Sequence, residues 1–348
     1  MEQKLIKDYN DATDKLKEIH PNFSSFYFEI SNKNQELKLF QEYCENFNLI
    51  KKLIIEESKY SKNFLLKAFP FEIFTYNNIQ NNLIYLEIKF KIYENKIYEN
   101  KIYNKFEKDL NLNDLRVLEE LRLENVKYLN LKASNLKYIY LTNCYIGLYQ
   151  NCFPKIKIIN LFGTELINIG EKIKLPKLEK FNTYNCYQAF KNIFDFKSFQ
   201  KLKCLVIDKI DDFLDLGDTL LEKVCINNHH CFSSLEEEKN MMEKLVEIKT
   251  IKEIKINLSY LFNDDLTSID DDNKTVKKLI INWENHKNNY YQYLYHDDQD
   301  LLLDNFKNKF PYLTDFEIYI NDSSLSPNNF RFNLGDNINF KIIKINNI

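Results

Sequence analysis

One pattern of apolar positions recurs along the chain. It consists of an apolar residue, any two residues, a second apolar residue, any one residue and a third apolar residue, as in Leu118-x-x-Leu121-x-Leu123. Each copy predicts a short β-strand, because its last two apolar positions alternate with other residues. Early copies follow one another about 20 residues apart, and such recurrence predicts a solenoid of stacked repeats. Further copies begin at Leu136, Ile156, Leu178, Leu202, Leu221, Ile251, Val276 and Leu313.

The segments around these copies predict additional elements. Helical spacing of apolar residues predicts an N-terminal helix that includes Leu5 and ends at His20-Pro21, and a second helix over residues 35–47. Residues 26–30 alternate like a half-buried strand, and weaker copies of the pattern begin at Ile50 and Leu83. Three later segments complete the prediction: a return-side strand from Val126 to Leu131, a helix from Leu235 to Ile248 after capping-box serines at 233 and 234, and a helix through Leu301, Leu302 and Phe306 that stops near Pro311.

The amino-acid composition restricts the possible functions of the chain more than it restricts its possible folds. Lys and Arg number 48 against 51 Asp and Glu, and only Arg116, Arg122 and Arg331 are arginines. A net charge of -3 with so little arginine argues against a nucleic-acid partner. The charged N-terminus and the lack of long apolar runs argue against a signal peptide and a membrane span. Seven cysteines without a paired framework fit a reducing compartment, so a cytoplasmic location is expected.

The glycines and the possible metal ligands point away from catalysis. None of the five glycines forms a phosphate-binding or nucleophile-elbow motif, and no H-E-x-x-H occurs. The cluster Cys225, His229, His230 and Cys231 has the wrong spacing for a short zinc motif, so we interpret His229 as a turn residue. The acidic runs do not fit an EF-hand and are interpreted as solvated loops. No catalytic residue, metal or cofactor is predicted, and a catalytic site assembled from distant positions has no visible motif.

Residues 118–321 resemble the leucine-rich-repeat superfamily, with weaker matches from about residue 50. The family pattern is L-x-x-L-x-L-x-x-N/C-x-L, and its ninth position implies a polar side chain that bonds neighbouring backbone groups in the turn after each strand. That position holds Cys144, Thr164, Cys186, His229, Ser259 and Asn321, whereas Val126, Ile210 and Glu284 depart from it. The resemblance implies an α/β solenoid with a parallel concave sheet and helices or irregular turns on the convex side.

The predicted organisation is a single solenoid domain over residues 1–348. It has an N-terminal helical cap at 1–47, degenerate early repeats at 48–117 with a low-complexity loop at 91–105, leucine-rich repeats at 118–321 and a C-terminal cap at 322–348. The loop carries a tandem five-residue repeat, KIYEN, whose period suits neither a strand face nor a helix face.

Side chains alternate along a strand, so pattern positions one, four and six should point into the core and positions three, five and seven outward. The outward positions of three successive copies predict a partner-binding patch. Aromatic and amide side chains are typical of interfaces, although tyrosine is abundant here and also favours strands. We therefore predict a non-catalytic scaffold that binds a protein or peptide; the alternative is a substrate-recognition subunit or effector in a larger complex, such as a ubiquitin-ligase adaptor. The predicted patch comprises Tyr138, Tyr140, Asn160, Phe162, Asn182 and Tyr184.

Overall fold

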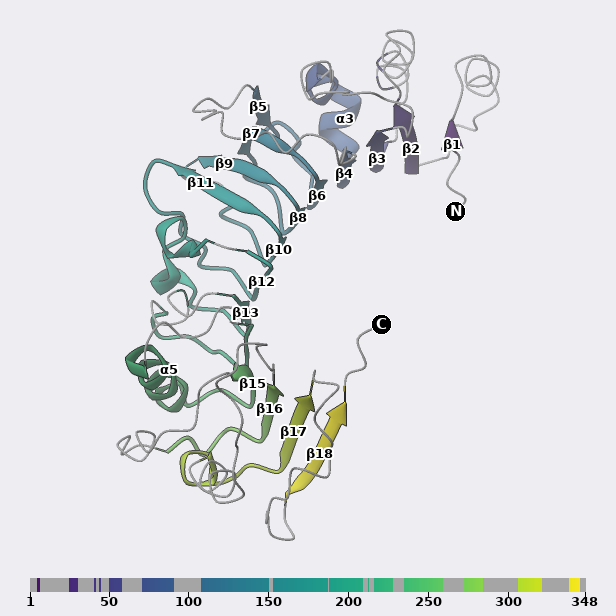
Figure 1. Cartoon of the computed structure of the whole chain (residues 1–348). Helices are drawn as coiled ribbons and strands as arrows, with labels where there is room; N and C mark the ends of the chain where they lie inside the picture. The colour runs from purple at the N-terminus through teal and green to yellow at the C-terminus, as the bar shows by residue number, and fades with distance from the viewer. Residues whose placement is uncertain are drawn as a thin grey trace, which may run out of the picture. The chain divides into compact units, whose positions relative to one another are not determined.

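Parallel β-strands dominate the chain, which is an α/β structure with few helices (Figure 1). Its internal contacts divide it into two compact units: residues 1–178 with 192–195 form unit 1, and residues 179–191 with 196–348 form unit 2. The predicted single domain over 1–348 stays a prediction. The computed structural model describes residues 5–6, 25–30, 41, 44, 50–57, 71–90, 108–149, 153–186, 188–208, 212, 216–227, 235–258, 272–283, 306–320 and 338–344.

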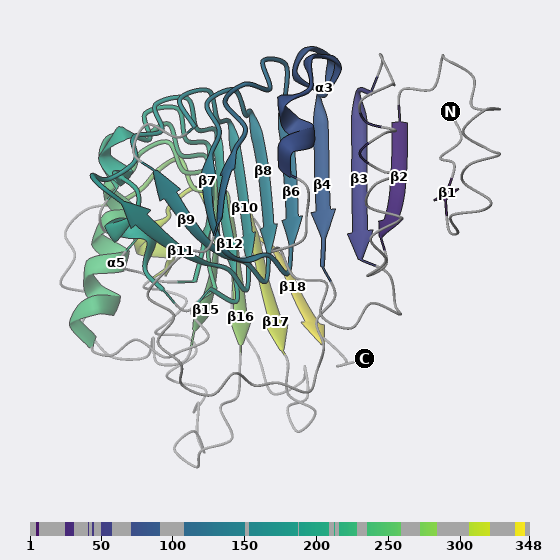
Figure 2. The ribbon, with the colours of Figure 1, turned by 90° about the horizontal axis from the view of Figure 1, so that it is seen from above.

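The first sheet of unit 1 is parallel, and its strands lie in chain order. Figure 2 shows β2, β3, β4, β6 and β8 pointing in the same direction. The register aligns the repeated pattern, because Leu121 pairs with Ile139 and Ile139 pairs with Ile159. The strands are β1 (Leu5–Ile6), β2 (Ser25–Ile30), β3 (Lys52–Glu57), β4 (Tyr85–Lys89), β6 (Glu120–Glu124), β8 (Tyr138–Thr142) and β10 (Ile158–Phe162).

A second parallel sheet forms the return side of unit 1 from residue 108 onward. Its strands are β5 (Lys108–Asn111), β7 (Lys127–Lys132), β9 (Tyr145–Tyr149) and β11 (Glu165–Ile169). The return-side strand predicted near Val126 is therefore confirmed as β7. The prediction of helices or irregular turns for this side is wrong over this stretch. Apolar residues also alternate along the return path, and each repeat therefore places one strand in each sheet.

The core of unit 1 consists of the inward side chains of these strands. Leu121 and Leu123 in β6 are 0% and 2% exposed, and Ile146 and Leu148 in β9 are 0% and 1% exposed. The burial along β8 alternates residue by residue, as the two-residue period of a strand requires. The predicted inward direction of pattern positions four and six is therefore confirmed in these strands.

The N-terminal predictions have mixed outcomes. Leu5–Ile6 form strand β1, so the predicted helix is wrong at these two residues, and the rest of it lies outside the described residues. The strand predicted at 26–30 is confirmed as β2. Gln41 and Cys44 are helical, while the rest of the predicted helix over 35–47 and the loop over 91–105 lie outside the described residues. Between β3 and β4 the chain forms the short helices η2 (Phe71–Thr75) and α3 (Asn77–Asn82).

The turns after β6, β8 and β10 of the first sheet each contain a residue with positive φ. Asn125 follows β6 with φ 58°, Asn143 follows β8 with φ 51°, and Gly163 follows β10 with φ 53°. Asparagine and glycine tolerate this left-handed conformation better than other residues do. A side chain at position 163 would also be crowded, because a Cβ there would lie 2.6 Å from Asn143 Oδ1.

The polar side chains at the ninth pattern position bond backbone groups in these turns, as the sequence predicted. The Cys144 Sγ–H donates toward the carbonyls of Leu123 and Thr142, at 3.3 and 3.2 Å. Thr164 Oγ1 lies 3.1 Å from the Leu141 carbonyl and accepts from the Cys144 N–H at 3.3 Å. These bonds link one turn to the next, and they satisfy backbone groups that the strands leave unpaired. His229, Ser259 and Asn321, predicted for the same role, lie outside the described residues.

Unit 2 contains a second run of parallel strands in chain order. Figure 2 shows β15, β16, β17 and β18 pointing in the same direction. The register again aligns the apolar pattern, because Ile254 pairs with Leu279 and Leu279 pairs with Phe316. The strands are β12 (Lys180–Tyr184), β13 (Cys204–Ile207), β14 (Lys223–Ile226), β15 (Glu253–Leu258), β16 (Lys278–Trp283), β17 (Asp315–Ile320) and β18 (Asn339–Lys344).

Among the residues of unit 2 that the structure describes, helices rather than strands lie on the return side. The predicted helix is confirmed as α5 (Leu235–Glu247), and Met241, Met242, Leu245 and Val246 are 0% exposed. Residues 306–309 are helical before the predicted stop at Pro311. The capping serines at 233 and 234, and Leu301 and Leu302, lie outside the described residues.

A phenylalanine cluster fills the first part of the unit 2 core. Phe181 in β12 contacts Phe190, Phe196 and Phe199 with ring centroids 5.5 to 6.0 Å apart. These rings are at most 1% exposed. Phe190 and Phe196 belong to the short helices η3 (Phe190–Asn192) and η4 (Phe196–Ser198). The contacts with Phe190 and Phe196 are edge-to-face and add to the stabilisation that burial of the rings provides.

Candidate functional site

The outer face of each unit is the face of the main sheet that carries pattern positions three, five and seven. In unit 1, β8 and β10 place six uncharged side chains on this face in three cross-strand pairs. The register pairs Tyr138 with Ile158, Tyr140 with Asn160, and Thr142 with Phe162. Five of these side chains are half-buried, and Phe162 is 44% exposed. We call this set the neutral strip: Tyr138, Tyr140, Thr142, Ile158, Asn160 and Phe162.

The structure brings four of the six predicted site residues together in the neutral strip. The other two, Asn182 and Tyr184, lie on β12 in unit 2. Tyr184 is 42% exposed, but Asn182 is only 3% exposed, so its side chain offers little surface to a partner. A patch that spans all six residues stays a prediction.

A charged network borders the neutral strip on its β6 side. The Arg122 Nε–H donates to Glu120 Oε1 at 2.8 Å, and the Arg122 guanidinium lies 4.5 Å from the Tyr140 ring centroid. The same guanidinium lies 5.5 Å from the Tyr85 ring, and Lys52 Nζ lies 4.3 Å from that ring. Cations over tyrosine faces are attracted by the ring quadrupole. Arg122 is therefore held between aromatic rings from the strands on either side of β6.

Glu87 in β4 is tied into the same network. It accepts a hydrogen bond from the Tyr85 hydroxyl at 2.5 Å and forms an ion pair with Lys89 at 2.9 Å. Burial alone would raise the pKa of Glu87, but the bonds from Tyr85 and Lys89 outweigh it and hold the pKa below its usual range. Burial and the Glu87 carboxylate together raise the pKa of Tyr85. Glu87 is therefore ionised and paired at neutral pH, which suits a structural role better than proton transfer.

Sequence analysis did not single out Lys52, Tyr85 or Glu87. The apolar pattern could have identified Lys52 and Tyr85, because the weaker copies that begin at Ile50 and Leu83 place these two residues at outward position three. The register shows the same relation: Lys52 pairs with Tyr85, and Tyr85 pairs with Glu120.

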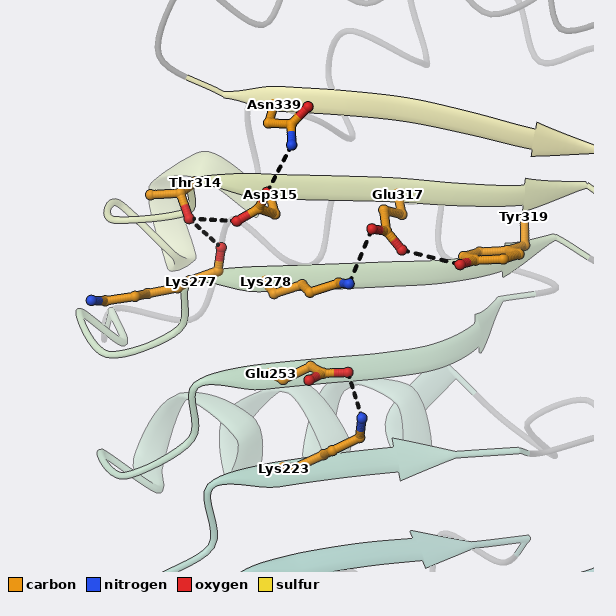
Figure 3. A network of polar contacts seen from close by, with 9 residues as sticks. All are labelled: Lys223, Glu253, Lys277, Lys278, Thr314, Asp315, Glu317, Tyr319 and Asn339. Carbon is orange, nitrogen blue, oxygen red and sulfur yellow. Dashed lines mark hydrogen bonds and ion pairs between the residues drawn. The ribbon is translucent and has the colours of Figure 1, made fainter.

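The outer face of unit 2 carries a ladder of paired charges, shown in Figure 3. Lys223 in β14 pairs with Glu253 in β15 at 2.7 Å, and Lys278 in β16 pairs with Glu317 in β17 at 3.0 Å. The Tyr319 hydroxyl donates to the second Glu317 oxygen at 3.1 Å. The two ion pairs cross between neighbouring strands, whereas the bond from Tyr319 to Glu317 lies within β17.

Asp315 is held in the same way at the edge of this ladder. Thr314 Oγ1 donates to Asp315 Oδ2 at 2.8 Å, and Asn339 Nδ2 donates to Asp315 Oδ1 at 3.0 Å (Figure 3). These two hydrogen bonds lower the pKa of Asp315. Like Glu87, Asp315 is stabilised as a carboxylate, so neither group has the raised pKa that a general acid at neutral pH needs.

Cys144 and Cys225, two of the cysteines that the structure describes, do not have the properties of nucleophiles. Burial raises the pKa of Cys225 to about 11 and that of Cys144 to about 12. A thiol with such a pKa is almost fully protonated at neutral pH, whereas a reactive cysteine has a lowered pKa. Cys225 Sγ–H donates to Asn227 Oδ1 at 3.2 Å.

The possible metal cluster is only partly visible. His229, His230 and Cys231 lie outside the described residues, so the interpretation of His229 as a turn residue stays a prediction. Within the ranges that the structure describes, no three His, Cys, Asp or Glu side chains gather as a metal ion would require.

Comparison with known proteins gives no relative: no family model and no curated protein matches the chain. The leucine-rich-repeat resemblance therefore rests on the residues alone. None of the helices among the described residues is both long and apolar enough to cross a lipid bilayer.

Proposed function

We propose that the chain is a leucine-rich-repeat solenoid and acts as a non-catalytic scaffold for protein interaction. Two features support the repeat type. The apolar pattern is in register between neighbouring strands, and Cys144 and Thr164 bond the turns at the ninth position of the pattern. The strand-on-strand return path of unit 1 is an irregular form of such a repeat.

The neutral strip carries the functional part of the proposal. Charged residues make up 28% of the chain, and the neighbouring strand β6 presents Glu120, Arg122 and Glu124 outward. The strip nevertheless has no charged side chain on two adjacent strands, and its most exposed member is Phe162. Protein interfaces share this arrangement, with an aromatic centre depleted of charge and a polar rim. The partner would be a protein or a peptide that contacts the strip directly.

The pairing of the acidic groups supports a binding role over catalysis. Glu87, Glu317 and Asp315 each accept bonds from a cation, a hydroxyl or an amide. Such groups make a stable surface, because each carboxylate is already compensated.

The test is affinity capture from the native host with three forms of the full chain. The strip variant carries Tyr138→Ala, Tyr140→Ala and Phe162→Ala. The matched control carries Tyr145→Ala and Tyr149→Ala, which remove half-buried tyrosines of β9 in the second sheet of the same unit. We expect one protein to be captured by the wild type and the control and lost by the strip variant, with circular dichroism showing that all three forms are folded. Equal capture by the folded strip variant would refute the proposal.

A further inference from the structure

The main-sheet strands of unit 1 all begin at one edge of the sheet. They are parallel, so their starting ends lie on the same side, as Figure 2 shows for β4, β6 and β8. Backbone hydrogen bonds connect the residues at pattern position two along this edge. The Ile84 N–H donates to the Lys51 carbonyl at 2.8 Å, and the Glu119 N–H donates to the Ile84 carbonyl at 2.9 Å. The N–H groups of Lys137 and Lys157 continue the series.

Three turns that precede these strands project from the same edge. In each turn a backbone N–H bonds the carbonyl three residues earlier, as from Leu118 to Leu115 and from Ile156 to Phe153, both at 3.1 Å. These bonded residues are buried, whereas the two residues between them are exposed. We call the position-two residues and these turn tips the entry edge of unit 1: Lys51, Ile84, Glu119, Lys137 and Lys157, with the tips Arg116-Val117, Pro154-Lys155 and Pro176-Lys177.

Basic residues outnumber carboxylates on the entry edge. It holds six basic residues and a single carboxylate, Glu119, which pairs with Lys137. The basic residues at the turn tips form no ion pair within the part of the chain that the structure describes. Charged residues at the flanking positions balance one another and leave the excess in place: Lys52, Lys132, Lys174 and Lys180 against Asp114, Glu120 and Glu179. The edge is therefore positive although the chain carries a net charge of -3.

Two apolar side chains are exposed among these cations. Ile84 is 41% exposed and Val117 is 39% exposed, which is unusual for large aliphatic residues of this chain. The corresponding turns of unit 2 expose Leu220 and Tyr312. Carboxylates offset more of the lysine charge there, so the inference is restricted to unit 1: Glu179, Asp218, Glu222 and Asp272.

From this combination we infer that the entry edge of unit 1 binds the surface of a membrane that contains anionic lipids. Its basic residues lie against the negatively charged headgroups, and Ile84 and Val117 insert into the apolar boundary beneath them. Projecting turn tips can reach a flat surface, and such contact needs no membrane-spanning segment. A nucleic acid fits less well, because phosphate contacts are polar and leave the two aliphatic side chains without a role. The edge is separate from the neutral strip, so the inference does not rest on the proposed function.

The test is co-sedimentation of the purified full chain with vesicles of phosphatidylcholine alone and of phosphatidylcholine mixed with phosphatidylserine. We expect binding to the mixed vesicles only, and its loss at high salt, because salt screens exposed charges. An edge variant should bind at least about tenfold more weakly, since each basic residue near an anionic surface contributes about fivefold. It carries Arg116→Gln, Lys155→Gln and Lys177→Gln.

A matched control removes the same charge from the outer faces of the two units. It carries Lys89→Gln, Lys255→Gln and Lys341→Gln, and its affinity should stay within about twofold of the wild type. Circular dichroism checks that each variant is folded. The strip variant should also bind the mixed vesicles as the wild type does, which keeps this result independent of the proposed function.

Ile84→Thr combined with Val117→Thr tests the apolar part of the contact at constant charge. This threonine variant should bind the mixed vesicles at least about threefold more weakly. Equal binding to both kinds of vesicle, absence of binding to the mixed vesicles, or full binding by the folded edge variant would each overturn the inference. Full binding by the threonine variant would overturn it as well, and displacement of the chain by single-stranded RNA would then identify the edge as a nucleic-acid site.

Discussion

Replacing Asn273 should destabilise unit 2 strongly, because this side chain is buried and fully engaged. It is 0% exposed, and its Nδ2 group donates to the carbonyls of Leu245 and Ile248 at 3.0 and 2.9 Å. These carbonyls belong to the end of α5, where a helix leaves acceptors without internal partners. Asn273 Oδ1 accepts from the Thr275 N–H at 3.0 Å. One amide thus joins α5 to the turn before β16.

The magnitude follows from counting the groups that lose a partner. Asn273→Leu keeps a similar volume but leaves two carbonyls and one N–H in the interior without this partner. Each such group costs about 1–3 kcal/mol, so the free energy of unfolding should fall by at least about 3 kcal/mol. That loss is a large part of the 5–15 kcal/mol that is typical of a folded domain.

Asn273→Asp gives the same experiment a dependence on pH. The carboxylate would face two carbonyls at the negative end of α5, and both burial and this contact raise its pKa in the folded state above the unfolded value of about 3.9. The folded state then binds the proton more tightly than the unfolded state does. The variant should therefore lose stability as the pH rises above about 4 and recover it as the pH falls.

The assay is urea unfolding followed by tryptophan fluorescence. The single tryptophan of the chain, Trp283, lies in β16, so its signal reports on unit 2. Asn308→Leu and Asn308→Asp are the matched controls, because Asn308 is exposed in the same unit, and they should change the stability by less than about 0.5 kcal/mol. A loss below about 1 kcal/mol for Asn273→Leu, with an unchanged denaturant slope, would refute the reasoning.

Three further predictions concern single contacts. Gly163→Ala should destabilise unit 1 by about 1–3 kcal/mol in thermal unfolding followed by circular dichroism, because φ is 53° and the new Cβ would meet Asn143 Oδ1; an unchanged melting temperature would contradict this. Glu253→Gln should change the stability by less than about 1 kcal/mol, because the Lys223 partner is 46% exposed, and a larger loss in urea would show that the ladder acts as a unit. Cys225 should resist alkylation at pH 7.5 in the folded chain and react only after unfolding, as mass spectrometry can measure, whereas rapid labelling would contradict its raised pKa.

Much of the fold could be predicted from the apolar pattern, because the pattern records which side chains are buried. The copies at Leu118, Leu136 and Ile156 each became a strand in the expected register. The sequence prediction is wrong where one apolar spacing fits both a helix and a strand. Leu5 fits a helical spacing, but Leu5 and Ile6 lie in strand β1, since pairing with β2 decides the state of so short a segment.

The return side of unit 1 was harder to predict for a related reason. Val126-x-x-Leu129-x-Leu131 was recognised as a strand, but the strands β9 and β11 were not. Their segments are short, and apolar runs of that length fit irregular turns equally well. Only stacking against β7 makes them a sheet, because a single short strand has no partner for its backbone groups.

The sequence predicts on which face of the sheet the side chains of the candidate site lie, but not how exposed each of them is. Outward position five holds Tyr140 in β8, which is half-buried, and Val206 in β13 and Cys225 in β14, which are each only 5% exposed. A short side chain in the middle of an outer face is covered by longer neighbours on adjacent strands, whereas a tyrosine extends past them. The period of two therefore identifies the face, and the lengths of cross-strand neighbours decide which of its residues a partner can reach. By this criterion Phe162 and Tyr140 of unit 1 are accessible, whereas Asn182 of unit 2 is not.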